Sequence, residues 1–185
     1  MDKLKKQKLL SFIFLILFLI LELFWSLFLI PNFKNISKTS VTIDTSINYD
    51  YNYIMELLTT YKAQGIKYYN YLQLFDIIFS VVYLLFFIFS FKFLFIYLEE
   101  KANFYFNKFL YIFIVILLPF LTYLFDSLEN IFIFLIRKTY PYIPQIYVKL
   151  SNIFTILKFL FFFFNLILII LIIIKIIYLK LIKKT

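Results

Sequence analysis

The chain contains no cysteine and no histidine. Without cysteine it has neither disulfides nor thiolate ligands, and without histidine it has no imidazole for zinc, for haem iron or for a nucleophile–base pair. Any metal site would have to be built from carboxylate and carbonyl oxygens. We therefore expect neither a metal nor a cofactor.

Glycine is almost absent as well, because Gly65 is the only one. An aspartyl intramembrane protease requires a G-x-G-D motif, which a single glycine cannot supply, and rhomboid-like and metal-dependent intramembrane proteases require histidine. A lone glycine suggests a backbone position with positive φ. Since it follows Ala63 and Gln64 at the end of a helical pattern, we expect Gly65 to end that helix as its C-cap.

Charged residues make up only 16% of the chain, whereas 64% of it is hydrophobic and the mean hydropathy is +0.95. Soluble domains are roughly half apolar, so this composition indicates an integral membrane protein. Several apolar runs are long enough to cross a bilayer as helices. The sequence predicts an all-α, polytopic protein with a single membrane domain, residues 1–185, that forms a four-helix transmembrane bundle. The expected spans are about 9–30, 72–98, 109–136 and 153–174.

The basic residues predict the orientation of the bundle. A net charge of +9 would also suit a nucleic-acid partner, but the lysines lie mostly at the ends of the predicted spans. We therefore interpret them as topology signals that contact anionic lipids, and we expect no nucleic acid. Both basic termini and the short turn with Lys101 and Lys108 fall on one side, which predicts cytoplasmic N- and C-termini in a cell or plasma membrane. Pro31 is expected to end the first span, which is interpreted as an uncleaved signal anchor.

The segment 31–71 is the only sizeable polar stretch, and we expect it to form a small helical loop outside the membrane. Asp50 is placed to cap a helix over Tyr51–Tyr61. The segment is rich in tyrosine, which has two interpretations: anchoring of the loop at the membrane surface, which we favour, or a surface for a ligand or partner. The tyrosines are Tyr49, Tyr51, Tyr53, Tyr61, Tyr68, Tyr69 and Tyr71.

Polar side chains recur at helical spacing along each predicted span. The densest stripe is in the third span: Pro119, Thr122, Asp126, Glu129, Asn130, Ile133 and Arg137. Because a charge in lipid costs several kcal/mol, this stripe must face a protein interior or a wet cavity. At a rise of about 1.5 Å per residue, polar groups of all four helices fall at one level in the outer third of the membrane. We expect one cluster that opens outward: Glu22, Gln73, Asp76, Asp126, Glu129, Asn130 and Lys158, with Arg137 at its edge.

This cluster has two interpretations. As a structural element, it holds the bundle in register through interhelical hydrogen bonds and ion pairs. Lys158 would then neutralise Asp126 or Asp76, and Arg137 would reach Glu129. As a site, it has four acids against two bases, which is more acid than pairing requires. The remaining carboxylates are then available to bind a cation, to carry a proton or to act as acid and base on a lipid-like substrate.

Some of these residues belong to a pattern of three elements. The elements are a Tyr-x3-Gly-x3-Tyr segment, an acid early in the second span and a D-x-x-E-N motif in the third. The residues are Tyr61, Gly65, Tyr69, Asp76, Asp126, Glu129 and Asn130. Over about residues 50–140 the chain resembles a group of small, uncharacterised four-helix membrane proteins. It is more loosely similar to emopamil-binding and sigma-2-type proteins, which pair an outer loop with acidic residues in a lipid-accessible pocket. The resemblance implies a fold and no activity, and the histidine of the sterol isomerases is missing here.

Three functions are compatible with these patterns. The first is a non-enzymatic membrane protein whose acidic cluster packs the helices or contacts a lipid or a partner, either another membrane protein or a second copy of the chain. The second is a small carrier or a proton- or cation-linked module, for which Ser90 and Asn165 give little support in the cytoplasmic half. The third is a lipid-modifying enzyme with Asp126 and Glu129 as acid and base. We favour the first and leave enzymatic activity open.

Overall fold

The computed structural model describes residues 2–182, and within that range it is helical with no strand. It confirms the predicted four-helix bundle, because four helices are long and apolar enough to cross a membrane. They are Lys3–Ser37, Tyr51–Lys101, Lys108–Thr139 and Gln145–Leu181. Two lysines of the predicted basic C-terminus, Lys183 and Lys184, lie outside the described residues. The chain is thus a multi-pass membrane protein by the length and apolar character of its helices.

The first span does not end at Pro31, which is a correction to the sequence prediction. It consists of α1 (Lys3–Phe24), the π-helical turn η1 (Trp25–Leu29) and α2 (Ile30–Ser37). A proline ring normally clashes with the carbonyl one turn earlier, and it has no N–H to donate there. The wider turn of η1 ends two residues before Pro31 and removes this conflict. A π turn changes the hydrogen-bond pattern of a helix and is one of the usual ways in which a helix adapts to a proline. The helix therefore continues for another two turns.

The third span repeats this arrangement. It consists of α4 (Lys108–Ile112), the π-helical turn η3 (Phe113–Leu117) and α5 (Leu118–Thr139). Pro119 follows η3 as Pro31 follows η1, at the start of the next α-helix. Both prolines are therefore tolerated inside long helices, since each occupies the first turn after a π segment.

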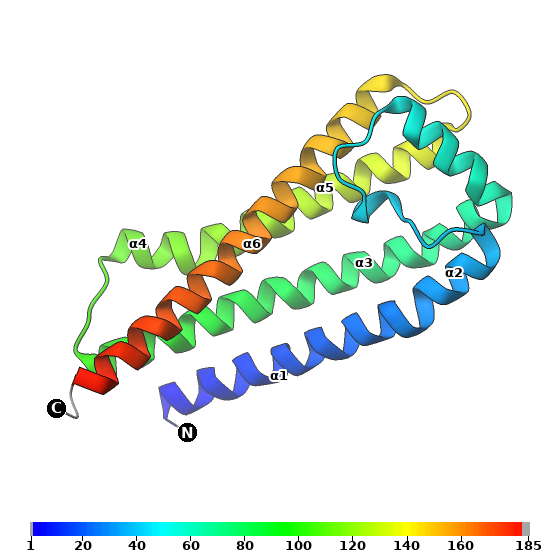
Figure 1. Cartoon of the computed structure of the whole chain (residues 1–185). Helices are drawn as coiled ribbons and strands as arrows, with labels where there is room; N and C mark the ends of the chain where they lie inside the picture. Colours follow the sequence, from blue (N-terminus) through cyan, green and yellow to red (C-terminus); the bar gives the residue numbers. More distant parts are fainter. Residues whose placement is uncertain (1, 183–185) are drawn as a thin grey trace.

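The helix α3 (Tyr51–Ala102) begins as predicted, with the Asp50 side chain accepting a hydrogen bond of 2.8 Å from the backbone N–H of Tyr53. It bends sharply at Lys62, where φ is 55° and ψ is 177°. The part before the bend lies across one end of the bundle, and the part after it forms the second span (Figure 1). The predicted small helix before the second span is therefore the first three turns of α3.

Gly65 is not a C-cap with positive φ, because the backbone leaves the helix at Lys62 instead. Gly65 is buried inside α3 against α2. A Cβ atom at this position would lie 3.0 Å from the Cβ of Ser37 and 3.1 Å from the Cβ of Tyr61. The glycine is required for the close approach of two helices, and not for an unusual backbone conformation.

The four spans pack as two pairs. The helix α1 packs along α3, and α5 packs along α6 (Gln145–Ile182), while α3 also contacts α5 and α6. The helix α1 begins and α6 ends at the same end of the bundle, shown on the left of Figure 1. We call this the terminal end. The opposite end, called the loop end, carries the connection between α2 and α3 and the turn between α5 and α6 (Figure 1).

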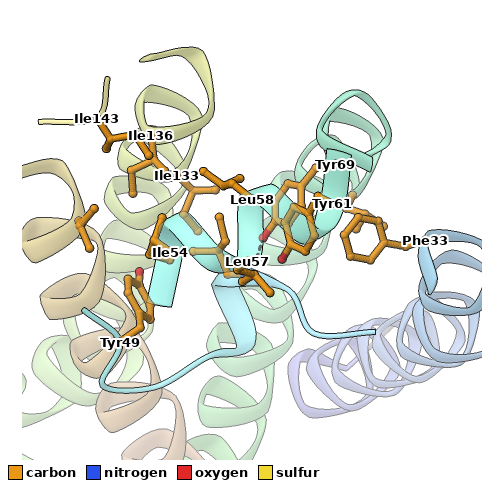
Figure 2. Close-up of a cluster of buried hydrophobic side chains, with 13 residues drawn as sticks. Phe33, Tyr49, Ile54, Leu57, Leu58, Tyr61, Tyr69, Ile133, Ile136 and Ile143 are labelled. Atoms are coloured by element: carbon orange, nitrogen blue, oxygen red, sulfur yellow. Dashed lines mark hydrogen bonds between the residues drawn. The ribbon is translucent and has the colours of Figure 1, made fainter. Parts of the chain in front are cut away.

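A compact core fills the loop end. Its buried side chains come from α2, the following connection, both parts of α3, α5 and the start of α6, and Figure 2 shows most of them. Tyr61 and Tyr69 stack on each other with ring centroids 5.8 Å apart, and Phe33 meets both edge-on. Since Tyr49, Tyr61 and Tyr69 are 0–6% exposed, they are core residues. The interpretation of these three as anchors at the membrane surface is therefore wrong, whereas Tyr71 is exposed.

Candidate functional site

The ammonium group of Lys158 lies at the centre of the polar cluster. Its Nζ is 3.2 Å from Oδ1 of Asp126 and also forms an ion pair with Glu129. Both carboxylates lie on α5, three residues apart, and Lys158 reaches them from α6. The predicted pairing of Lys158 with Asp126 is present, but the lysine bridges two acids where the sequence suggested one. All three side chains are buried, so the single positive charge of Lys158 is shared by two carboxylates inside the bundle.

Hydroxyl groups satisfy the second oxygen of each of these carboxylates. The Tyr83 hydroxyl, on α3, donates to Oδ2 of Asp126 at 2.8 Å. The Thr155 hydroxyl, one turn before Lys158 on α6, donates to Oε1 of Glu129 at 2.6 Å. The ion pair therefore ties α3, α5 and α6 together. Such contacts fix the register of a membrane bundle, because apolar packing alone does not distinguish protein from lipid.

A second polar chain runs from Arg137 to Asp76. The Arg137 guanidinium donates to Oε1 of Gln73, and the Gln73 amide donates to the backbone carbonyl of Asn130 at 2.5 Å. The Asn130 amide in turn donates to Oδ2 of Asp76 at 2.7 Å. The prediction that Arg137 contacts Glu129 is wrong. The guanidinium points toward α3 instead, where it also donates to Oδ1 of Asn70 at 2.6 Å. Its charge reaches a carboxylate only through two carboxamides.

The connection between α2 and α3 contributes a carboxylate that sequence reasoning missed. Asp44, in the 3₁₀ turn η2 (Ile43–Thr45), is buried and accepts a hydrogen bond from the Tyr69 hydroxyl. Lys158 donates to the backbone carbonyl of Asp44 at 3.3 Å, and the Arg137 guanidinium lies 4.7 Å from the centre of the Tyr69 ring. The turn η2 therefore covers the cluster and contacts Lys158 directly, whereas it is linked to Arg137 only through Tyr69. No periodicity marks Asp44, because it lies outside the helices.

Tyr49 fastens the same connection to α6. Its hydroxyl lies 2.6 Å from the Ser151 hydroxyl and 3.3 Å from that of Thr155, and the backbone N–H of Asn48 donates to Asn152 at 3.1 Å. Burial raises the pKa of the Tyr49 hydroxyl to about 12, so it stays protonated as a hydrogen-bond donor at any physiological pH. The connection is thus attached to the bundle at two places, by Asp44 and by Asn48 with Tyr49.

Beneath η2 lies a cavity of about 340 Å³ between α1, α3 and α6. Its polar lining is formed by Glu22, Asp44, Thr45, Asp76, Asp126 and Lys158. Aromatic side chains form the rest: Phe18, Trp25, Phe79, Tyr83, Phe159 and Phe162. The volume lies within the range of about 300–1,000 Å³ that small-molecule sites occupy. An apolar chamber with a few convergent polar groups is the usual composition of such a site.

The cavity divides the predicted cluster residues into two groups. Asp76, Asp126 and Lys158 line it, whereas Gln73, Glu129 and Asn130 lie behind it and hold these groups in place. Glu22 lines the cavity from α1 and is exposed. Within residues 2–182, Glu22 has no hydrogen bond or ion pair to another side chain. The structure thus places three of the seven residues in the Lys158 ion pairs and three in the chain from Arg137 to Asp76, and Glu22 lies across the cavity from both.

A layer of aromatic rings closes the cavity toward the terminal end. Phe18 of α1 stacks on Phe79 of α3 with centroids 5.1 Å apart, and it lies 6.5 Å from Phe162 of α6. Phe162 also packs edge-on against Tyr83 and Phe87. Below these rings, polar contacts are isolated, such as the 2.9 Å contact of the Ser11 and Ser90 hydroxyls. The polar cluster therefore does not continue as a channel through the bundle.

Within the described residues, no group of three or more acidic side chains has a geometry that would hold a metal ion. No protein-family model, curated protein or solved structure matches this chain. A function for the site must therefore be inferred from its geometry and charge.

Proposed function

We propose that this membrane protein binds the head of an amphipathic, lipid-like molecule in the cavity beneath η2. The observation that carries this proposal is the composition of the cavity, with carboxylates at its loop end and aromatic rings around the remainder. The helices α1 and α6 form two of its walls, yet each packs mainly on another helix, α1 on α3 and α6 on α5. The seam between α1 and α6 gives a molecule dissolved in the bilayer a lateral route to the cavity.

In this proposal the two parts of the cluster have separate roles. The Lys158 ion pair and the Arg137–Gln73–Asn130 chain pack the helices, and the cavity in front of them receives the ligand. Catalysis by an Asp126–Glu129 pair is less well supported, because Glu129 is fully buried behind Lys158 and does not line the cavity. A transport path is disfavoured by the ring layer of Phe18, Phe79 and Phe162.

A cavity-filling substitution tests this function. In Phe18→Trp a larger ring would occupy the cavity, whereas Phe14→Trp places the same ring one turn earlier, where Phe14 stacks on Phe89 outside it. Purified protein in lipid nanodiscs would be photolabelled with dodecanol and dodecylamine probes that carry a diazirine, and the labelled peptides mapped by mass spectrometry. We expect label at the α3 and α6 walls, reduced several-fold in Phe18→Trp and unchanged in Phe14→Trp. Equal labelling of both variants by both probes would refute a ligand cavity.

We also propose that the loop end faces the outside and that both termini are cytoplasmic, as the lysine distribution predicts. Because the chain has no cysteine, no native residue of this protein competes with the introduced cysteine for the label. Ser40 is an exposed residue of the loop end, and Glu100 is exposed near the terminal end. In intact cells, a membrane-impermeant maleimide should label Ser40→Cys, whereas Glu100→Cys should react only after the cells are opened. The reverse pattern would invert the proposed orientation.

A further inference from the structure

We propose that the cavity selects a ligand with a cationic head, an organic ammonium on an apolar chain, and that Asp76 and Glu22 bind this head. The inference rests on the proposed ligand-binding function and names the class of ligand. It starts from the charges around the cavity, where four carboxylates face a single base. That base, Lys158, is already engaged by Asp126 and by Glu129 behind the wall.

Asp76 is a carboxylate whose ionic partner is missing from the described residues. Its Oδ2 accepts the Asn130 amide at 2.7 Å, and the chain through Gln73 to Arg137 holds this amide in place. Two neutral carboxamides thus separate Asp76 from the nearest guanidinium. The side chain is half-buried at the edge of a cavity within a membrane span. A carboxylate in such surroundings is stabilised by a cation that enters the cavity.

Glu22, on the neighbouring helix α1, also lacks an ionic partner within residues 2–182. It is exposed on α1 within a long apolar span, and in the described part of the chain no base lies within ion-pair distance of it. Asp126 adds a third acceptor, because its Oδ1 is buried and accepts no hydrogen bond, having only the ion contact with Lys158. Three carboxylates from α1, α3 and α5 therefore have capacity for a positive charge.

The aromatic walls favour an organic cation over a metal ion. Trp25, Phe79 and Phe162 line the cavity, and a cation near such rings is attracted by their π faces. Lys158 already shows this contact, with its Nζ 5.1 Å from the centre of the Phe159 ring. A metal ion would need several oxygen ligands around one point, and the described residues offer no such group. An ammonium with apolar substituents satisfies both the rings and the carboxylates.

An anionic head is disfavoured by the same geometry. Among the described residues, Lys158 is the only base that lines the cavity, and a phosphate would have to displace Asp126 or Glu129 from it. The displaced carboxylate would then be left buried without a partner, while Asp44 and Asp76 would repel the ligand. The cavity is thus built to discriminate between head groups by the sign of their charge.

The test compares three dodecyl probes that differ only in the head: trimethylammonium, hydroxyl and phosphate. Binding to the protein in nanodiscs would be measured by competition with the dodecylamine photoprobe. We expect the ammonium probe to bind most tightly and the phosphate probe most weakly. Asp76→Asn should weaken the ammonium probe by about tenfold and Glu22→Gln by less, because the trimethylammonium head is held by charge attraction alone and a half-buried carboxylate attracts it more strongly than an exposed one. Binding of the hydroxyl probe should change little in either variant, which also shows that the cavity is intact.

Glu56→Gln is the matched control, because it removes the same charge from an exposed position of α3 outside the cavity. If the three probes bind equally, or if the phosphate probe binds best, the ammonium inference is wrong while the ligand cavity stands. If both acidic variants retain full preference for ammonium, the assignment of Asp76 and Glu22 is wrong. If no probe competes at the cavity, the proposed function itself fails.

Discussion

Replacing Lys158 with methionine is expected to lower the free energy of unfolding by about 3–5 kcal/mol, the usual cost of leaving buried charges without their partner. The structure provides the reason, because Lys158 supplies the positive charge that two carboxylates of 0–1% exposure share. Their remaining partners, Tyr83 and Thr155, are neutral hydroxyls. Thermal unfolding in detergent should show a large decrease in midpoint temperature for Lys158→Met.

Lys149→Met is the matched control, since it removes the same charge from an exposed position of the same helix. It should leave the midpoint nearly unchanged, because exposed charges contribute little to stability. Combining Lys158→Met with Asp126→Asn and Glu129→Gln should recover much of the loss, since all three charges of the ion pairs would be removed together. Equal effects of the two lysine substitutions, or additive losses in the triple variant, would contradict the role of the ion pair.

The bridging geometry also changes the expectation for Asp126. From the sequence, Asp126→Asn would leave Lys158 without its nearest counter-charge. In the structure Glu129 still pairs with Lys158, so we expect a smaller loss for Asp126→Asn than for Lys158→Met. Each carboxylate partly substitutes for the other, whereas nothing substitutes for the lysine. The order of the melting temperatures of the wild type, Asp126→Asn and Lys158→Met therefore distinguishes a lysine that bridges two carboxylates from a simple pair.

The helices and their buried faces could be predicted because lipid imposes a simple rule on polar side chains. The stripe from Pro119 to Arg137 was expected to face the interior, and all seven of its residues are buried. The hydrogen bond of Asn130 with Asp76 and the ion pair of Lys158 with Asp126 follow from the same periodicity, since polar groups at one depth on adjacent helices find each other.

The connection between α2 and α3 could not be predicted in the same way. Asp44 and Tyr49 reach the cluster through an irregular backbone, which carries no repeating pattern. Tyrosine is common both at membrane surfaces and in aromatic cores, so composition did not decide between these environments for Tyr61 and Tyr69. Their burial depends on how α2 packs against α3, and the packing of two helices cannot be read from a local sequence pattern.

Pro31 and Gly65 show a related limit of local rules. A proline in a helical pattern usually marks an end, but a π turn before it lets the helix continue. A single glycine usually marks a turn, but here it lies in a helix where another helix comes close. The constraints are real in both cases, since proline lacks an N–H and glycine lacks a Cβ. The structure satisfies the first with a π turn and uses the second for close packing of two helices.

The close approach at Gly65 leads to the second large effect. Gly65→Val is expected to lower the free energy of unfolding by about 1–3 kcal/mol, the usual cost of overpacking a well-packed contact. The Cβ alone would lie 3.0 Å from the Cβ of Ser37 and 3.4 Å from its Cα, so the two further methyl groups of valine could fit only if the backbone of α2 moved. That movement would also disturb Phe33, which packs edge-on against Tyr61 and Tyr69 in the core of the loop end.

Gly65→Ala and Gln64→Val separate this clash from effects on the helix itself. Alanine adds only the Cβ atom and gains about 1 kcal/mol of helix propensity over glycine, so its net effect should be small. Gln64 is the exposed neighbour in the same helix, and valine there has the same β-branched side chain without a facing backbone. Melting temperatures in detergent should fall clearly for Gly65→Val and only slightly for Gln64→Val. If the two valine variants melt alike, the contact between Gly65 and Ser37 does not constrain the packing of α2 on α3.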